Sequence, residues 1–278
     1  MYICINGKIF KEKNAKISVL DNGFLYGDGF YDTMRSYQGK ILEHHQHLER
    51  LTTSANLMGI TLAWSLVDIE KWTRLIVAKN KIKEGRVRVT VTRGSQGFDF
   101  LHCDHPTLVI TAEELKVESG DYTKGVTAFT LSLQRTLPQI KTLGLTVMIQ
   151  AYRSILPKGG YEAILVDGSG YVIEGASTNI FWIKNQVLYT TKKNMLNGLT
   201  RQRVINLAAK NKIKVKLVEA KVKVLYEADE IFLSNRPREI IPVIKIDQKK
   251  IGMGHPGPLT KKIMWLYHEH VVFSLGLK

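Results

Sequence analysis

Residues 1–114 alternate between strand and helix patterns of hydrophobic positions. Strict alternation over Arg86–Thr92 predicts a strand, and the spacing of Leu48, Leu51, Ala55 and Met58 predicts an amphipathic helix. Asn6-Gly7, between two short apolar runs, predicts a hairpin. The other predicted elements are strands at Tyr2–Ile5, Lys8–Phe10, Phe30–Tyr37, Ile41–Glu43 and Thr107–Thr111, and a helix at Leu66–Asn80.

The second half of the chain continues this mixture after a polar break at Glu113–Thr123. Its predicted strands are Val126–Leu133, Ala163–Asp167, Ile180–Lys184, Val187–Tyr189, Glu230–Ser234 and Ile240–Lys245; its predicted helices are Leu145–Leu156, Leu199–Asn211 and Pro258–Phe273. We expect a two-domain α/β (α+β) protein. A small N-terminal domain would span residues 1–114, a linker 115–123, and a larger C-terminal domain with a mixed sheet 124–278.

Composition narrows the class of protein. Hydrophobic residues make up 44% of the 278 residues, which suits a globular chain. The two cysteines, Cys4 and Cys103, exclude a disulfide scaffold and favour the reducing cytoplasm. No apolar run approaches the ~18 residues of a membrane span, and Met1–Gly7 lacks the features of a signal peptide, so we expect neither.

The chain carries 40 Lys+Arg against 25 Asp+Glu, a formal net charge of +15. This charge permits nucleic acid, anionic surfaces or small anions as partners. The basic residues are spread over both halves, and dense groups such as Lys210–Lys223 alternate with apolar residues, as on solvated faces. We therefore expect neither a nucleic-acid nor a membrane partner.

Three segments carry candidate chemistry. Lys141 lies in an apolar run between a strand and a helix, where it either extends to solvent or is a buried amine able to form a Schiff base. Glu174 precedes a glycine and reads either as a turn residue or as a functional carboxylate. Gly198–Arg201 opens a helix, whose free N–H groups either are simply capped or bind a phosphate.

Histidines form two groups that invite a metal hypothesis, one at positions 44, 45 and 47 and one at 102–105 with Cys103. His44 and His45 are adjacent and cannot share a helix face, and the second group lies in a predicted loop. We expect solvated histidines and no metal.

Taken together, these segments resemble the fold-type IV pyridoxal 5′-phosphate (PLP) enzymes, which include D-amino-acid aminotransferase, branched-chain aminotransferase and aminodeoxychorismate lyase. The resemblance is collinear over essentially the whole chain. The matching segments are Phe24–Tyr31, His47–Leu51, Gln139–Thr142, Tyr161–Leu165, Glu174–Phe181, Leu196–Arg201, Ala228–Phe232 and Ile241–Val243.

The resemblance implies roles for matching residues. Lys141 resembles the lysine that forms a Schiff base with PLP and then acts as the catalytic base, and Glu174 the carboxylate that faces the pyridine nitrogen. The cofactor phosphate would be bound by Arg50, by Leu199 and Thr200 at a helix start, and by the segment Asn235–Arg236. Arg236 stands where aminotransferases usually have Thr, and three alternatives stay open: phosphate binding, substrate carboxylate binding, or extension into solvent.

Substrate residues differ from the family patterns. Tyr31 resembles a substrate-pocket tyrosine, and Thr33, Arg93 and Phe98 are the other candidates for substrate contact. D-amino-acid aminotransferases place an Arg and a His after the Thr-Arg-Gly strand to trap the substrate carboxylate. Phe98 and Phe100 stand at those places here, which argues against the same trap.

The leading hypothesis is a PLP-dependent aminotransferase that moves an amino group between a small amino acid and a 2-oxo acid. The alternative within the family is aminodeoxychorismate lyase, which makes 4-aminobenzoate and pyruvate, and Thr33 and Asn235 favour it. A nucleic-acid-binding protein is the alternative outside the family. The resemblance also implies a homodimer with its active site at the domain boundary.

Overall fold

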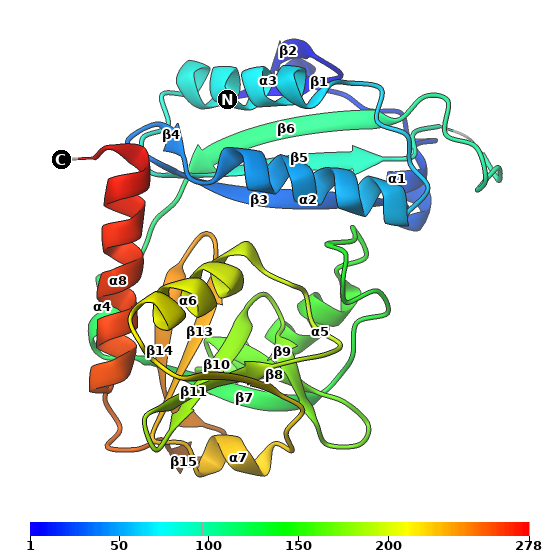
Figure 1. Ribbon diagram of the computed structural model, residues 1–278. Helices are drawn as coiled ribbons and strands as arrows, with labels where there is room; N and C mark the ends of the chain where they lie inside the picture. Colours follow the sequence, from blue (N-terminus) through cyan, green and yellow to red (C-terminus); the bar gives the residue numbers. More distant parts are fainter. Residues whose placement is uncertain (96, 278) are drawn as a thin grey trace. The chain divides into compact units, whose positions relative to one another are not determined.

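The computed structural model describes residues 1–95 and 97–277, which form two compact units (Figure 1). The first unit holds Met1–Lys116, Ile140–Gly144 and the residues from Ser274 onward; the second holds Val117–Gln139 and Leu145–Phe273. Lys141 therefore falls in the first unit, whereas a boundary at residue 124 would place it in the C-terminal domain. A short helix, α4 (Ser119–Thr123), occupies part of the stretch expected to be a linker.

The first unit is built on a six-stranded antiparallel sheet with the order β2-β1-β6-β5-β3-β4. Its strands are β1 (Tyr2–Ile5), β2 (Lys8–Lys11), β3 (Gly29–Tyr37), β4 (Lys40–Ile41), β5 (Gly85–Thr92) and β6 (Thr107–Glu114). The predicted hairpin is confirmed, because Asn6 and Gly7 both have positive φ and join β1 to β2.

Two helices pack on one face of this sheet, α2 (His44–Leu57) against β3 and α3 (Leu66–Lys79) against β6 and β1 (Figure 1). Val87, Val89 and Val91 of β5 are fully buried under them, so the alternation predicted for this strand is confirmed. Helix α2 begins at His44, four residues before Leu48, the first residue of the predicted helical pattern. The strand expected over Ile41–Glu43 consequently ends at Ile41.

Two short elements near the N-terminus were not predicted: the 3-10 turn η1 (Glu12–Asn14) and helix α1 (Asn22–Tyr26). The side chain of Asp21 caps α1 by accepting a hydrogen bond from the Gly23 N–H at 2.8 Å. A helix of five residues is too short to leave a periodic signal in the sequence.

The second unit is built on a nine-stranded mixed sheet with the order β12-β11-β10-β13-β14-β7-β8-β9, and β15 pairs with β14. The pairs β11/β12, β14/β7 and β7/β8 are parallel. The strands are β7 (Val126–Ser132), β8 (Glu162–Val166), β9 (Val172–Gly175), β10 (Asn179–Lys184), β11 (Val187–Thr191), β12 (Val215–Val218), β13 (Glu230–Asn235), β14 (Glu239–Ile246) and β15 (Lys249–Lys250).

The helices of this unit are α5 (Thr146–Ile155), the 3-10 turn η2 (Leu156–Lys158), α6 (Leu199–Lys210), α7 (Lys223–Tyr226) and α8 (Pro258–Leu275). Strand β12 lies in the lysine-rich segment that was interpreted as a solvated face. It forms an edge of the sheet, where alternating lysines keep other strands from adding on. Among the described residues, no helix combines the length and apolar character that crossing a membrane requires.

Candidate active site

Lys141 is fixed by backbone pairing with the start of β3. Its carbonyl accepts a hydrogen bond from the Tyr31 N–H at 2.8 Å, and Leu143 donates to the Gly29 carbonyl at 3.0 Å. The Lys141 amine lies 5.2 Å from the centre of the Tyr31 ring. The first unit thus brings together the expected cofactor lysine and the expected substrate-pocket tyrosine.

The sheet face around Tyr31 is polar. Register pairs Tyr31 with Thr90 and Thr33 with Arg88, and all four side chains are partly exposed on the face opposite the valine core. The Arg88 guanidinium stacks 3.6 Å from the centre of the Tyr31 ring, and its Nε donates to Thr90 Oγ1 at 3.1 Å. Burial lowers the pKa of Arg88. Arg88 is not among the candidate site residues expected from the sequence. The alternation of Arg86–Thr92 predicts a strand but does not indicate what the polar face of that strand binds.

Arg50 is held by a buried carboxylate. Both oxygens of Asp32 accept from this guanidinium at 2.8 Å, and Asp32 Oδ1 also lies 2.7 Å from His47 Nδ1. Burial alone would raise the pKa of Asp32, but the charges and hydrogen bonds of Arg50 and His47 hold it well below its usual range. Asp32 therefore stays ionised and orients the Arg50 guanidinium.

The expectation that the histidines are solvated is wrong for His44 and His47, which are buried under α3 and β3. His44 Nε2 lies 2.7 Å from Thr73 Oγ1, and burial lowers the pKa of His44 to about 4. His45 is exposed, as expected. Among residues 1–95 and 97–277, no group of three or more His, Cys, Asp or Glu side chains is arranged to hold a metal ion.

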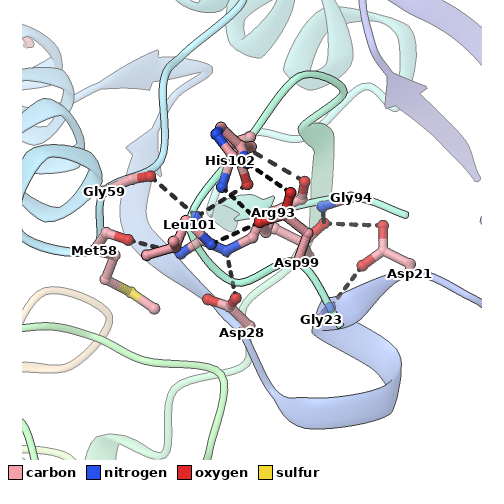
Figure 2. Close-up of polar contacts among 12 residues, drawn as sticks. Asp21, Gly23, Asp28, Met58, Gly59, Arg93, Gly94, Asp99, Leu101 and His102 are labelled. Carbon is pink, nitrogen blue, oxygen red and sulfur yellow. Dashed lines mark hydrogen bonds and ion pairs between the residues drawn. The ribbon is translucent and has the colours of Figure 1, made fainter. Parts of the chain in front are cut away.

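Arg93 is buried, and its donors are directed at the protein itself. The guanidinium donates to Asp28 Oδ2 at 2.6 Å, to the Met58 carbonyl at 2.8 Å and to the Gly59 carbonyl at 3.1 Å. Figure 2 shows these groups converging on Arg93 at the base of the loop that also carries Asp99 and His102. The arrangement fits a structural anchor of this loop rather than a substrate contact.

Phe98 is the most exposed of the substrate candidates, with 82% of its surface accessible. Its ring lies 5.8 Å from that of Tyr26 and 6.1 Å from that of Phe100, so the three rings form an exposed aromatic cluster on the first unit. Such a cluster offers apolar contact and no charge for a carboxylate.

Glu174 is a buried strand residue, so its interpretation as a turn residue is wrong. It lies in β9, and only 3% of its surface is exposed. Oε2 accepts hydrogen bonds from the Leu196 N–H at 3.0 Å and from Asn179 Nδ2 at 3.3 Å. Oε1 accepts from Arg135 Nη1 at 3.0 Å. These donors stabilise the ionised carboxylate, the form that can pair with a protonated ring nitrogen.

The N-terminus of α6 fits a phosphate. Helix α6 starts at Leu199, and the N-cap Gly198 provides no side-chain cap. Thr200 Oγ1 is buried and has no hydrogen-bond partner among the described residues. A buried hydroxyl beside free N–H groups at a helix start is the chemistry that a phosphate ester requires. The second unit therefore offers groups that suit both the ring nitrogen and the phosphate of PLP.

Asn235 and Arg236 end β13 and begin the turn that follows it. Asn235 Oδ1 accepts from the Arg238 N–H at 2.9 Å, and its amide donates to the Ser177 carbonyl at 3.4 Å. Arg236 is buried and donates to the Tyr267 hydroxyl at 3.0 Å, so the alternative in which it extends into solvent is wrong.

Comparison with known proteins identifies the class of enzyme. The family profile described as "Amino-transferase class IV" matches residues 29–246. A "Putative branched-chain-amino-acid aminotransferase" of Methanocaldococcus jannaschii is 34% identical over 272 residues, covering 95% of this chain and 94% of that protein. A "D-alanine aminotransferase" of Listeria monocytogenes is 32% identical over 284 residues, covering 99% of this chain and 98% of that protein.

Among solved structures, the branched-chain amino acid aminotransferase of Escherichia coli matches with a TM-score of 0.88 and 28% identity, covering 96% of this chain and 92% of that one. A second branched-chain amino acid aminotransferase, from T.th. and complexed with N-(5′-phosphopyridoxyl)-L-glutamate, matches with a TM-score of 0.91 and 26% identity, covering 98% of this chain and 94% of that one. The chain belongs to the class IV aminotransferase family, whose members are enzymes that use PLP. The fold-type IV architecture, the aminotransferase class and the PLP cofactor expected from the sequence are thereby confirmed.

Proposed function

We propose that the chain transfers an amino group between a small amino acid and a 2-oxo acid, and that Lys141 and Glu174 are ligands of its PLP cofactor. The observation that carries this proposal is the Lys141 amine beside Tyr31, on a sheet face that also presents the Arg88 guanidinium. An amine for the cofactor aldehyde and a cation for a carboxylate are the two groups that this reaction requires.

The cofactor would be held at three points. Lys141 would bind its aldehyde, Glu174 would pair with its ring nitrogen, and Thr200 with the first N–H groups of α6 would bind its phosphate. Arg50, oriented by Asp32, is a second phosphate ligand in this proposal. When bound, PLP supplies an electron sink that weakens the Cα–H bond of the amino acid.

The chain's own residues would then bind the substrate and move one proton. Arg88, held against Tyr31 and Thr90, would bind the substrate carboxylate as a permanently charged donor fork. The Lys141 amine would take the proton from the substrate Cα and return it in the second half of the reaction. Arg93 is left out of the substrate site, because its donors serve Asp28 and backbone carbonyls.

The test separates a transaminase from a lyase. A transaminase consumes an amino acid only when a 2-oxo acid acceptor is present, and Lys141→Ala abolishes turnover, whereas Lys124→Ala, at an exposed position, does not. Borohydride reduction of the holoenzyme followed by peptide mapping should place the phosphopyridoxyl group on Lys141. Pyruvate release from aminodeoxychorismate without any acceptor would establish the lyase instead.

The phosphate role has a matched pair of variants. Thr200→Val removes a buried hydroxyl at the start of α6. Thr260→Val removes a buried hydroxyl in α8 that likewise has no hydrogen-bond partner within the described part of the chain. We expect Thr200→Val to weaken PLP binding about tenfold and Thr260→Val to leave it unchanged. Equal effects of the two substitutions would contradict phosphate binding by Thr200.

We also propose a cytoplasmic homodimer. Both cysteines are free, which suits a reducing compartment. Large apolar side chains are exposed on the first unit, including Leu20, Phe24 and Leu101, and such side chains are candidates for an association surface. Sedimentation should give twice the chain mass of 31.5 kDa. Phe24→Asp should reduce this mass, whereas Phe273→Asp, at a still more exposed position, should not.

A further inference from the structure

The carboxylate proposed to bind the cofactor ring nitrogen already carries an ion pair within its own unit. Arg135 Nη1 lies 3.0 Å from Glu174 Oε1, and this guanidinium is 22% exposed against 3% for the carboxylate. The other oxygen, Oε2, is satisfied by the Leu196 N–H and by Asn179. The ion pair with Arg135 is made through Oε1.

Arg135 reaches this carboxylate from a segment of irregular backbone. Residues 133–139, between β7 and the segment that carries Lys141, form neither helix nor strand. Backbone of this kind can change conformation at lower cost than a strand held by ladder hydrogen bonds. Glu174, by contrast, is held in β9. The arginine is thus the adaptable partner of the pair and the glutamate is the rigid one.

We propose that Arg135 competes with the cofactor ring nitrogen for Glu174 and thereby sets the affinity of the protein for PLP. This inference rests on the proposed role of Glu174. A carboxylate oxygen can accept two hydrogen bonds, but two cations on one buried carboxylate repel each other. When PLP binds, the Arg135 guanidinium is therefore either displaced from Glu174 or repelled by the protonated ring nitrogen. Both consequences weaken the binding of PLP.

The same ion pair protects the protein without cofactor. An ionised carboxylate that is buried without a cation is strongly destabilising, because its desolvation is not compensated. Arg135 supplies the cation in direct contact with Glu174 until the ring nitrogen does, and the buried Arg201 guanidinium, which the charge of Glu174 also reaches, supplies a second. The ion pair thus stabilises the cofactor-free protein relative to the cofactor-bound protein.

The test is PLP titration of the cofactor-free protein, followed by tryptophan fluorescence. We expect Arg135→Gln to tighten PLP binding about 5–50-fold, the range expected when one competing charge is removed from a partly screened site. The same variant should lower the Tm of the cofactor-free protein more than that of the holoenzyme. Arg153→Gln, which removes an exposed arginine of α5, controls for the change in net charge and should alter neither quantity.

A double-mutant cycle separates this inference from the proposed function. In a Glu174→Gln background, Arg135→Gln should no longer tighten binding, because the shared carboxylate charge is gone. If Glu174→Gln itself leaves PLP affinity unchanged, the proposed role of Glu174 fails. If Glu174→Gln weakens binding but Arg135→Gln in the wild-type background weakens it or leaves it unchanged, Arg135 supports the carboxylate instead of competing for it, and the inference is overturned.

Discussion

Asp32→Asn is the substitution whose cost follows most directly from the structure. Asp32 is 2% exposed and accepts two hydrogen bonds from Arg50 and one contact from His47, all within 2.8 Å. The asparagine keeps the shape of Asp32 and removes its charge, so it leaves the half-buried Arg50 guanidinium beside a neutral amide. Removing one partner of a buried ion pair costs about 3–5 kcal/mol of unfolding free energy. Because the Arg50 side chain is 16% exposed, we expect the loss of unfolding free energy to lie near the lower end of this range, at about 3 kcal/mol.

Urea unfolding of the variant and the wild type, followed by circular dichroism, measures this loss. Amide hydrogen exchange should localise it to α2 and β3, the elements that Asp32 joins. Asp104→Asn, at an exposed position, is the matched control and should stay within about 0.5 kcal/mol of the wild type.

The dependence on pH provides a second check. Because the pKa of Asp32 is lowered on folding, its contribution is fully present above the unfolded pKa and declines as the pH falls below about 4 towards the folded-state pKa. The difference between wild type and Asp32→Asn should therefore be constant from about pH 5 to about pH 7 and shrink on acidification. A loss below about 1 kcal/mol at neutral pH, or one that grows in acid, would refute the assignment.

Three further substitutions test other parts of the chain. Burial lowers the pKa of His44 to about 4, so the folded protein should lose about 2 kcal/mol between about pH 7 and about pH 5 through this residue, and urea unfolding of His44→Gln should lack that loss. Arg93→Ala should speed chymotryptic cleavage at Phe98–Leu101 about tenfold, because the loop loses its anchor; exposed Arg74→Ala should not. In Gly198→Ala the new Cβ would lie 2.2 Å from Asn179 Oδ1 and disturb a donor to Glu174, so PLP titration should show weaker binding, whereas Gly168→Ala, with open space around it, should bind normally.

Local patterns predicted most of the regular structure for physical reasons that are visible in the core. Val87, Val89 and Val91 alternate because one face of β5 is buried, and Leu48, Leu51 and Ala55 recur at helical spacing because one face of α2 is buried. Among the elements that were missed, α1 is short, β12 is rich in lysine, and β9 ends in Glu174-Gly175, so each leaves a weaker signal. In these elements tertiary pairing, not local propensity, determines the conformation.

The histidines show where a sequence pattern misleads. Adjacent histidines are usually solvated, but α2 turns His44 and His47 inward and leaves His45 outside. Their burial depends on two partners distant in sequence, Thr73 for His44 and Asp32 for His47. Because these contacts cannot be seen in the sequence, a buried histidine and an exposed one give the same sequence pattern.

Three arginines show that residues of one type take different roles in this protein. In the sequence, Arg88, Arg93 and Arg135 are three cations among 40 basic residues, and their spacing says nothing of their partners. In the structure Arg93 binds backbone carbonyls and Asp28, Arg88 stacks on the ring of Tyr31, and Arg135 pairs with Glu174. A guanidinium can anchor a loop, bind a carboxylate or compete for one, and the group it faces decides among these roles. The total charge of +15 therefore says little about function. The partner that each cation faces is what indicates its role.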